Sequence, residues 1–344
     1  MANSSLGATA VAEAVWFGGP QRVEIREESV PAVGPDHVRI RNVVSGLSAG
    51  SELLVYRGEV PSELQPDLPT IGGDFGFPVK FGYASVGTVV ERGSRVELPA
   101  LDDLVFVHHP HQTEFVVPAD ATTRLPADLP PEVGVFSANL ETAVTVTLDA
   151  HPRLGEAVLV VGQGVVGLLV TMLLQRVGAR PIVTVDLHER RREASASAGA
   201  DHVLDANVDL VGTLRQLTGG RGVDIAVEAS GSPAALQSCI EAAAFTGTVI
   251  VASWYGTREV SLALGGTFHR RRVRVVSSQV STLDPSITPR WDRRRRTALV
   301  SELLQELPLS KMISHRLPFA DAASAYELLD RAPGECLQVV LDYV

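Results

Sequence analysis

Three glycines in the stretch VLVVGQGVVG have the spacing of a phosphate-binding loop. Gly162, Gly164 and Gly167 follow a short β-branched run and precede a longer, helix-like apolar run. In this pattern the first glycine permits a tight turn, the second lets a pyrophosphate approach the backbone, and the third lets helix and strand pack closely. The helix start, at Val165 and Val166, would point its backbone N–H groups at the phosphate. The pattern predicts a dinucleotide-binding loop.

An acidic residue follows at the distance that such a loop requires. Asp186 ends the next predicted strand, PIVTVD, 19 residues after Gly167. Its carboxylate would accept hydrogen bonds from the adenosine ribose and repel a 2′-phosphate, which favours NAD(H) over NADP(H). Arg190, Arg191 and Arg192 leave an alternative open, because a nearby arginine can hold that phosphate; otherwise they form a solvated helix face. We therefore expect NAD(H), with Arg191 close to it.

The elements around this loop follow two different patterns along the chain. Residues 1–130 indicate mostly β structure, because Val/Ile-rich runs such as HVRIRNVV and SVGTVVE are separated by Gly, Pro and Asp. Farther on, strands alternate with helices: 158–161 is a predicted strand, and 165–177 is a helix closed by Gly178. This alternation predicts a doubly wound parallel sheet with right-handed connections. The tail, from a helix near 293–306 to a last strand LQVVLDY, is mixed again.

These patterns predict an α/β fold with a β-rich domain that is interrupted by a dinucleotide-binding domain. We expect the first domain to comprise residues 1–138 and 280–344, and the second to comprise 139–279. The apolar segment 157–175 is long enough to suggest a membrane span. Glycines and Gln163 interrupt it midway, however, so that a buried parallel strand and its helix account for it better.

Composition limits the possible function classes. The chain has 344 residues, enough for two domains, and a formal net charge of −10, which argues against a nucleic-acid or anionic-membrane role. Only Cys239 and Cys336 occur, so neither a disulfide framework nor a four-cysteine zinc lobe can be built. The N-terminal stretch lacks a basic region followed by an apolar core, so we expect no signal peptide and a cytoplasmic protein.

With both halves in view, the chain resembles the medium-chain dehydrogenase/reductase family over nearly its full length. The resemblance is carried, in order and spacing, by GYASVGTVVERG, VVGQGVVG, VDLHERR, AGADHVLD, GGRGVDIAVEASG and ISHRLPFADAASAYELLD. Two further stretches, SGLSAGSELLVYRGEVP and ASWYG…FHRRRVRVVSSQ, are most similar to a bacterial branch that includes bacteriochlorophyllide hydroxyethyl dehydrogenases. The resemblance implies a GroES-like β-rich catalytic domain, a Rossmann cofactor domain, and a homodimer formed by edge-to-edge pairing of the cofactor sheets.

The chain departs from this family at the zinc ligands. Zinc-binding members carry a Cys where Ser48 stands, and His and Glu where Tyr83 and Ala84 stand. Their third ligand comes from a segment that aligns near Ala138 or Asn139. Ser, Tyr and Ala do not make a tetrahedral zinc site. The resemblance therefore implies a member without zinc.

Without zinc, another group must polarise the carbonyl and handle the proton of the alcohol. Tyr83 is the first candidate, because its phenol could hydrogen-bond to the developing alkoxide and pass a proton, with Ser48 and Ser51 as relays. The alternative is that Tyr83 only fills the vacated space. Lys80 could lower the phenol pKa only if the strand bends, and Glu52 is expected to support the site or begin a helix.

Three histidines between the predicted strands invite a metal interpretation. His108, His109 and His111 lie on a strand that a proline breaks, and this spacing is poor for converging on one ion. We expect structural or exposed histidines, with His111 as an alternative substrate-facing catalytic group. The basic runs HRRRVR and RWDRRRR are expected on a solvated face or a subunit contact, although an arginine there could hold an anion.

The remaining cofactor candidates follow later strands of the parallel sheet. They are Ser230, Ser253, Ser278 and Gln279, the last two near where the family places the nicotinamide. The leading hypothesis is a zinc-independent NAD(H) oxidoreductase that interconverts a secondary alcohol and a ketone on a multifunctional small molecule of secondary metabolism. A C=C reductase of the enoyl or quinone type and a catalytically inactive dinucleotide-binding protein stay open as alternatives.

Overall fold

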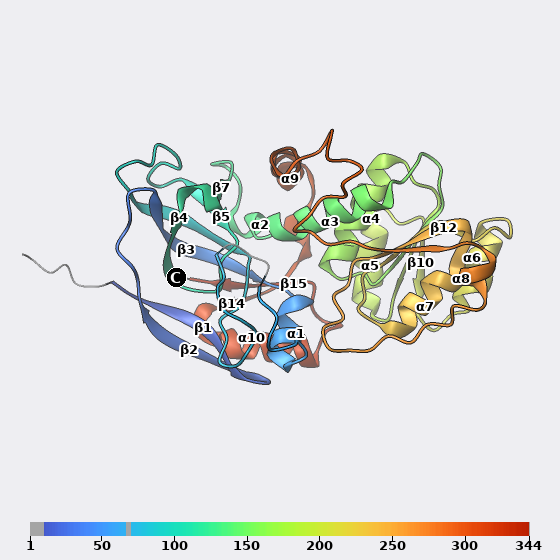
Figure 1. Ribbon diagram of the computed structural model, residues 1–344, viewed down its shortest axis with the longest axis horizontal. Coiled ribbons are helices and arrows are strands. Elements are labelled where there is room, and N and C mark those ends of the chain that lie inside the picture. The colour runs from blue at the N-terminus through green and yellow to red at the C-terminus, as the bar shows by residue number, and fades with distance from the viewer. Residues whose placement is uncertain (1–9, 67–69, 344) are drawn as a thin grey trace, which may run out of the picture. The chain divides into compact units, whose positions relative to one another are not determined.

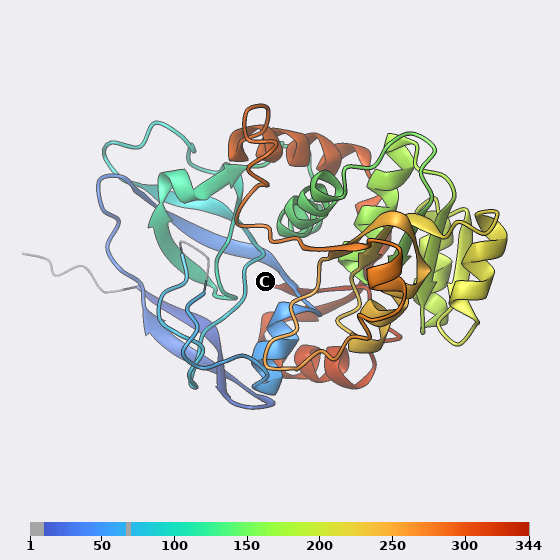
Figure 2. The same ribbon diagram turned by 45° about the vertical axis from the view of Figure 1, so that its right-hand side comes forward.

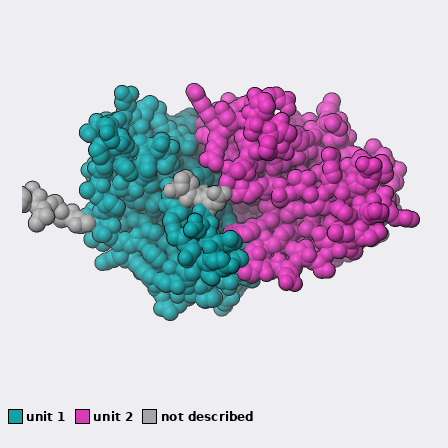
Figure 3. Space-filling model, in the orientation of Figure 1, with its two compact units in different colours: residues 1–138, 315–331, 338–344 teal, residues 139–314, 332–337 magenta. Residues whose placement is uncertain are grey.

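Contacts divide the chain into two compact units. The computed structural model describes residues 10–66 and 70–343. Unit 1 comprises Met1–Ala138, His315–Arg331 and Gln338–Val344, and unit 2 comprises Asn139–Ser314 and Ala332–Leu337 (Figure 3). The first boundary falls at the predicted position. The second differs, because the segment 280–314, which we expected in the β-rich domain, lies with unit 2.

A buried arginine explains why this segment stays with unit 2. Arg296 lies on helix α9 (Arg293–Glu306) and is only 5% exposed. Its Nη1 donates hydrogen bonds to Thr145 Oγ1 at 3.0 Å and to the carbonyl oxygen of Val280 at 2.5 Å. Thr145 belongs to α3 (Ser137–Ala150). Since a buried guanidinium must be hydrogen-bonded, these contacts hold α9 against α3.

Unit 2 is built on a six-stranded sheet in which neighbouring strands pair in parallel (Figure 1). In spatial order its strands are β10 (His202–Asp205), β9 (Ile182–Asp186), β8 (Val158–Val161), β11 (Val223–Glu228), β12 (Ala243–Val251) and β13 (Arg274–Ser277). Its remaining helices are α4 (Val165–Val177), α5 (Glu189–Ser197), α6 (Leu210–Leu217), α7 (Pro233–Ala242) and α8 (Thr267–Arg270). β8, α4 and α9 have the predicted bounds, β9 begins one residue later than predicted, and the predicted fold class is confirmed.

The strand order of this sheet fixes where a ligand can bind. β8 is buried along its whole length and lies beside β11, although β9 and β10 come between them in the chain. The chain therefore leaves β8 in one direction and later returns to its other side. In open α/β sheets, ligands bind outside the carboxyl ends of the strands at such a reversal point.

Unit 1 contains a hairpin and a larger, mainly antiparallel sheet. The hairpin pairs β1 (Val11–Gly19) with β2 (Arg22–Ser29). The sheet has the order β14 (Ile313–Pro318), β15 (Gln338–Asp342), β3 (His37–Leu47), β4 (Ser85–Arg92), β5 (Leu104–Val107) and β7 (Thr122–Arg124), and β6 (Glu114–Pro118) also pairs with β3. The helices of this part are α1 (Ser51–Arg57), α2 (Pro131–Gly134) and α10 (Ala322–Arg331). Figure 2 shows the same elements in a second view.

Two features of this unit matter for the site. β15, near the end of the chain, lies between β14 and β3 in the sheet. Helix α10 packs against α1, with Tyr326 stacked on Tyr56 at a ring-centroid distance of 5.7 Å. Segments from both ends of the chain are therefore needed to build this unit.

The apolar segment 157–175 is divided as expected. It forms β8 and most of α4, and both elements belong to the core of unit 2. Within the part of the chain that the structure describes, no helix has the length and hydropathy to cross a bilayer.

Candidate active site

The glycine loop joins β8 to α4 at the reversal point of the sheet. Gly162 has a φ of +91°, and a Cβ there would lie 2.7 Å from the backbone of Ser230. A Cβ at Gly167 would lie 1.9 Å from the carbonyl oxygen of Gly162. Gly164, by contrast, has nothing within 4 Å of that position. The outer glycines are thus required for packing, while the middle one leaves room for a phosphate at the helix start.

The acid that follows the loop is fixed as a hydrogen-bond acceptor. Val165 and Val166 begin α4, where the first backbone N–H groups have no partner within the helix. Asp186 ends β9, the neighbour of β8, and is 6% exposed. Its Oδ2 accepts from the backbone N–H of Gln163 at 2.7 Å, and its Oδ1 accepts from that of His188 at 2.8 Å. These bonds place the carboxylate beside the loop, as ribose binding requires.

The three arginines after Asp186 do not form a simple solvated face. Each donates to an acceptor in unit 2: Arg190 to the Glu335 carbonyl, Arg191 to the Pro333 carbonyl, and Arg192 to the Asp205 carboxylate, each at 2.8 Å. Arg191 Nη1 is also 4.0 Å from Asp186 Oδ2. The run therefore connects α5 to residues 332–337 and leaves less of its charge for a 2′-phosphate.

A second buried carboxylate, which we did not predict, shapes the loop after β11. Glu228 is fully buried at the end of β11, and its Oε1 accepts from Ser230 N, Ser230 Oγ and Gly231 N at 2.6–2.9 Å. Tyr255 donates to its Oε2 at 2.8 Å, and burial raises the pKa of that phenol. Ser253 Oγ accepts from Gly231 N at 2.9 Å. A charged residue directly after the apolar residues 225–227 was the signal that could have found it.

The other predicted cofactor residues follow strands of the same sheet. Ser230, Ser253 and Ser278 come just after β11, β12 and β13, so parallel pairing puts them at the same edge as the glycine loop. Ser278 donates to Asp149 Oδ2 at 2.6 Å, and Gln279 Nε2 donates to Ser281 Oγ at 2.9 Å. Burial raises the pKa of Asp149. The carboxyl edge of the sheet therefore collects the predicted dinucleotide contacts.

Unit 1 holds the predicted catalytic hydroxyls as one group. The hydroxyl of Tyr83 lies 3.0 Å from Ser51 Oγ and is also hydrogen-bonded to the Ser48 side chain. Burial of the phenol and the nearby negative charge of Glu52 raise the pKa of Tyr83 to about 12, against the opposing effect of the two serines. At neutral pH the group is therefore a proton donor rather than a base. Among the described residues, it is the cluster best suited to handle an alcohol proton.

Lys80 does not help Tyr83, contrary to the possibility raised by its spacing. Its ammonium group donates to Glu28 Oε2 at 2.7 Å and to Gln112 Oε1 at 3.0 Å. The backbone between the two residues passes close to the His111 ring at Gly82, which has a φ of +142°. A Cβ at Gly82 would lie 2.7 Å from that ring, so glycine is required there.

His111 is buried beneath the hydroxyls. It is 0% exposed, with Nδ1 2.7 Å from Ser45 Oγ and Nε2 3.0 Å from Glu52 Oε2. Tyr326 donates to the same carboxylate oxygen at 2.6 Å. This position suits the expected structural histidine better than the alternative that His111 faces the substrate, because both ring nitrogens contact protein groups. Glu52 lies in the first turn of α1, which is one of the two roles expected for it, whereas Tyr326 was absent from our predicted site residues.

The other two histidines have structural surroundings. His109 stacks on Phe115 with the ring centroids 3.7 Å apart, and burial lowers its pKa to about 3. His108 packs edge-on against Phe106. Residues 108–113 form no regular strand. Within residues 10–66 and 70–343, no three His, Cys, Asp or Glu side chains are grouped so as to hold a metal ion.

The donors present at the position of the family's zinc do not fit that ion. Ser48, Ser51 and Tyr83 offer three neutral hydroxyl oxygens, whereas zinc is held by thiolate, imidazole and carboxylate groups. Ala84 and Ala138 have no donor side chain, and the side-chain amide of Asn139, the alternative third position, is not one of the groups that hold zinc. We therefore derive no step through a metal.

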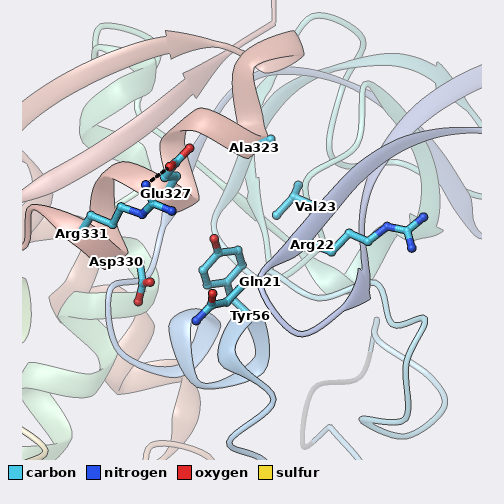
Figure 4. Close-up of a pocket in the computed structure, with 8 residues that line it drawn as sticks. All are labelled: Gln21, Arg22, Val23, Tyr56, Ala323, Glu327, Asp330 and Arg331. Carbon is cyan, nitrogen blue, oxygen red and sulfur yellow. Dashed lines mark ion pairs between the residues drawn. The ribbon is translucent and has the colours of Figure 1, made fainter.

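A surface hollow of about 300 Å³ in unit 1 is separate from this group (Figure 4). It is lined by Gln21, Arg22, Val23, Tyr56, Ala323, Glu327, Asp330 and Arg331. None of these is a member of the Tyr83, Ser51 and Ser48 cluster. The charges on α10 are already paired, with Arg57 bound to Asp330 at 2.6 Å and Arg331 to Glu327 at 2.7 Å. The charged side chains that α10 contributes to the hollow are therefore engaged in ion pairs.

Comparisons with known proteins agree with this geometry. A family described as "Zinc-binding dehydrogenase" matches residues 165–293. The chain is 26% identical to the D-guloside 3-dehydrogenase of Escherichia coli K12 over 340 residues, covering 93% of this chain and 97% of the relative.

Solved structures of the same fold cover nearly the whole chain. The 2R,3R-butanediol dehydrogenase of Bacillus subtilis superposes with a TM-score of 0.81 at 21% identity, covering 97% of this chain and 100% of that one. An alcohol dehydrogenase of Escherichia coli CFT073, complexed with NADH, superposes with a TM-score of 0.79 at 18% identity, covering 97% and 99%. At these identities the likeness shows the fold. Together with the family match over residues 165–293, the comparisons show the α/β fold of medium-chain dehydrogenases and an NAD(P)-dependent, alcohol dehydrogenase-like enzyme.

Proposed function

We propose that the protein is a zinc-independent, NAD(H)-dependent oxidoreductase that interconverts a secondary alcohol and a ketone. The observation that carries the proposal is the cluster of three side-chain hydroxyls formed by Tyr83, Ser51 and Ser48. These residues lie in the two segments that the resemblance aligns with zinc-binding segments of related enzymes. We place the reaction in the cytoplasm, which suits the two free thiols, Cys239 and Cys336.

The substrate class is supported by the names of similar proteins. One refers to oxidation at a secondary position of a glycoside, and another refers to a diol. We extend this pattern to the present chain and propose a secondary alcohol on a small molecule that carries further polar groups. The neutral hydroxyls around Tyr83 suit such a substrate, because they can both donate and accept hydrogen bonds.

The chain's own residues would manage the proton. When bound, the nicotinamide supplies or accepts the hydride. In ketone reduction the Tyr83 phenol donates its proton to the alkoxide oxygen, which is a stronger base than a phenolate. Ser48 and Ser51 donate hydrogen bonds to the phenolate that remains, and water returns the proton. Ketone, hydride and proton thus give the alcohol, and oxidation follows the same path in reverse.

Cofactor choice gives the first prediction. We expect NADH to bind at least tenfold more tightly than NADPH, because Asp186 would meet a 2′-phosphate as a like charge in a confined site. Asp186→Asn should reduce this ratio several-fold. Glu306→Gln is the matched control, because Glu306 is an exposed carboxylate of the same unit that pairs with Arg176 on α4. Fluorescence titration with both reduced cofactors measures the ratio. Equal or tighter binding of NADPH by the wild type would contradict the proposed preference.

Metal dependence gives the second prediction. We expect activity to survive dialysis against a chelator, and elemental analysis to find far less than one zinc per chain, because the hydroxyl oxygens of Ser48 and Tyr83 are poor zinc ligands. The control is a zinc-dependent alcohol dehydrogenase treated in parallel. Loss of activity on chelation that is reversed by added zinc would refute zinc independence.

The role of Tyr83 gives the third prediction. Tyr83→Phe removes the proposed proton donor while it keeps the ring, so single-turnover ketone reduction should slow by roughly a hundredfold with unchanged NADH affinity. Tyr56→Phe, on α1 in the same unit, is the matched control and should keep the wild-type rate. A rate within about threefold of wild type for Tyr83→Phe would show that the tyrosine only fills space. Turnover of an enone but of no ketone would favour the C=C reductase instead.

We also propose that two copies form a homodimer through their cofactor sheets. β13 is the last strand in the order of its sheet, and all four of its residues are exposed. Val275 and Val276 are each 37% exposed on this strand. An open edge with exposed valines is suited to pairing with the same edge of a second copy, which would also cover its backbone groups.

The dimer gives the fourth prediction. Val275→Lys combined with Val276→Lys should shift the mass measured by light scattering from dimer to monomer, because charges at the edge oppose strand pairing. Val208→Lys, at another exposed valine of unit 2, should leave the mass unchanged. NADH binding by each variant checks that it is folded. A wild type that is monomeric at micromolar concentration would overturn the dimer.

A further inference from the structure

A buried carboxylate lies beneath the proposed catalytic hydroxyls. Glu52 is 0% exposed, in the first turn of α1 and next to Ser51, which contacts Tyr83. Within the described part of the chain, its ion-pair partner is a histidine, His111, and no lysine or arginine. Taking a carboxylate out of water is costly unless several donors compensate it. Stability alone therefore does not explain why a carboxylate is buried at this position.

The hydrogen bonds around Glu52 can all be directed toward its carboxylate. Tyr326 donates to Oε2, and so does His111 when its proton is on Nε2. His111 Nδ1 then accepts from Ser45, whose hydroxyl accepts from Tyr343 at a distance of 2.8 Å. With this tautomer the imidazole is neutral, and the hydrogen bonds that link Tyr343, Ser45, His111 and Glu52 all have a donor and an acceptor. The donors of this network thus converge on Oε2 in the interior of unit 1.

One oxygen of this carboxylate is left without a donor. Glu52 Oε1 is buried and has no hydrogen-bond partner among the described residues. A buried charge that is incompletely compensated acts strongly on nearby titratable groups, because the surroundings screen it weakly. Burial and this charge raise the pKa of Tyr326 well above its ordinary value. The same charge raises the pKa of Tyr83.

The other titratable groups near Tyr83 do not offset this charge. They are His111 before β6, Tyr326 on α10 and Tyr343 after β15, all of which belong to the same hydrogen-bond network. Lys80, the nearest cation in the sequence, is engaged by Glu28. Ser48 and Ser51 favour the phenolate as donors, and Glu52 opposes them.

We propose that Glu52 is a positioning residue that acts on the reaction through Tyr83, and that its buried charge keeps the phenol protonated as a donor for the substrate oxygen. The inference rests on the proposed function, since it assumes that Tyr83 is the proton donor. His111 and Tyr326 hold the carboxylate in place and touch no substrate. In ketone reduction the charge opposes loss of the phenol proton, so that the phenol gives it up only to a base as strong as the alkoxide and is reprotonated readily by water afterwards.

A site-specific titration tests this without relying on activity. A difluorotyrosine inserted at position 83 titrates at lower pH than tyrosine, and fluorine NMR follows its phenol directly. In the wild-type background its pKa should exceed that of the same residue in an unfolded peptide. Glu52→Gln should lower that pKa by at least about half a unit, and Glu52→Asp, which keeps the charge, should restore most of it. Glu327→Gln, an exposed carboxylate on α10, should change nothing.

Kinetics on the same proteins separate this inference from the proposed function. Reduction needs the protonated phenol, so its rate falls as pH rises through the pKa of residue 83, and Glu52→Gln should move this fall to lower pH. If Glu52→Gln lowers the pKa of residue 83 but leaves the pH dependence of the reduction rate unchanged, Glu52 acts on Tyr83, and Tyr83 is not the proton donor. A normal pKa at position 83 in the wild type, or one that Glu52→Gln leaves unchanged, would overturn the inference. If Glu52→Gln does not fold, the pKa of residue 83 in the wild-type background is the test: a raised value supports the inference, and a normal value overturns it.

Discussion

The buried charge of Glu52 is the constraint on which unit 1 depends. Three segments far apart in the sequence must meet to supply its surroundings: α1, the stretch at His111 and helix α10 with Tyr326. Because an uncompensated carboxylate in the interior would cost several kcal/mol, these segments are fixed with respect to one another. Ser51 and Tyr83 lie directly on this framework, so their hydroxyls occupy defined positions.

Unit 2 also contains a buried carboxylate that needs hydrogen-bond donors. Glu228 is also fully buried, but its donors are the backbone N–H groups and hydroxyl of the loop that follows it, together with Tyr255. The loop that it shapes lies against Gly162, where a Cβ would collide with Ser230. A buried acid thus fixes a loop at the cofactor edge, and another fixes the hydroxyls of unit 1. In both cases a costly charge provides local rigidity where binding or chemistry needs it.

Local patterns predicted much of this structure, and long-range contacts account for what was missed. The glycine loop, the Gly178 cap and the buried strands are each determined by a few adjacent residues, so their positions were predictable. The pairing of Arg296 with α3 is not local, and the domain boundary near residue 280 was therefore placed too early. Tyr326 was missed for the same reason, since nothing near it indicates a carboxylate 274 positions away.

The position of β15 has a consequence for how the protein is made. This strand pairs with β3, and Tyr343 just beyond it binds Ser45, 298 positions earlier in the chain. A ribosome releases β3 long before β14 and β15, so β3 lacks its β15 partner during most of the translation of the chain. Such distant pairing slows folding and prolongs the exposure of strand edges. The six strands of unit 2 are complete earlier, and their sheet can assemble while translation of unit 1 continues.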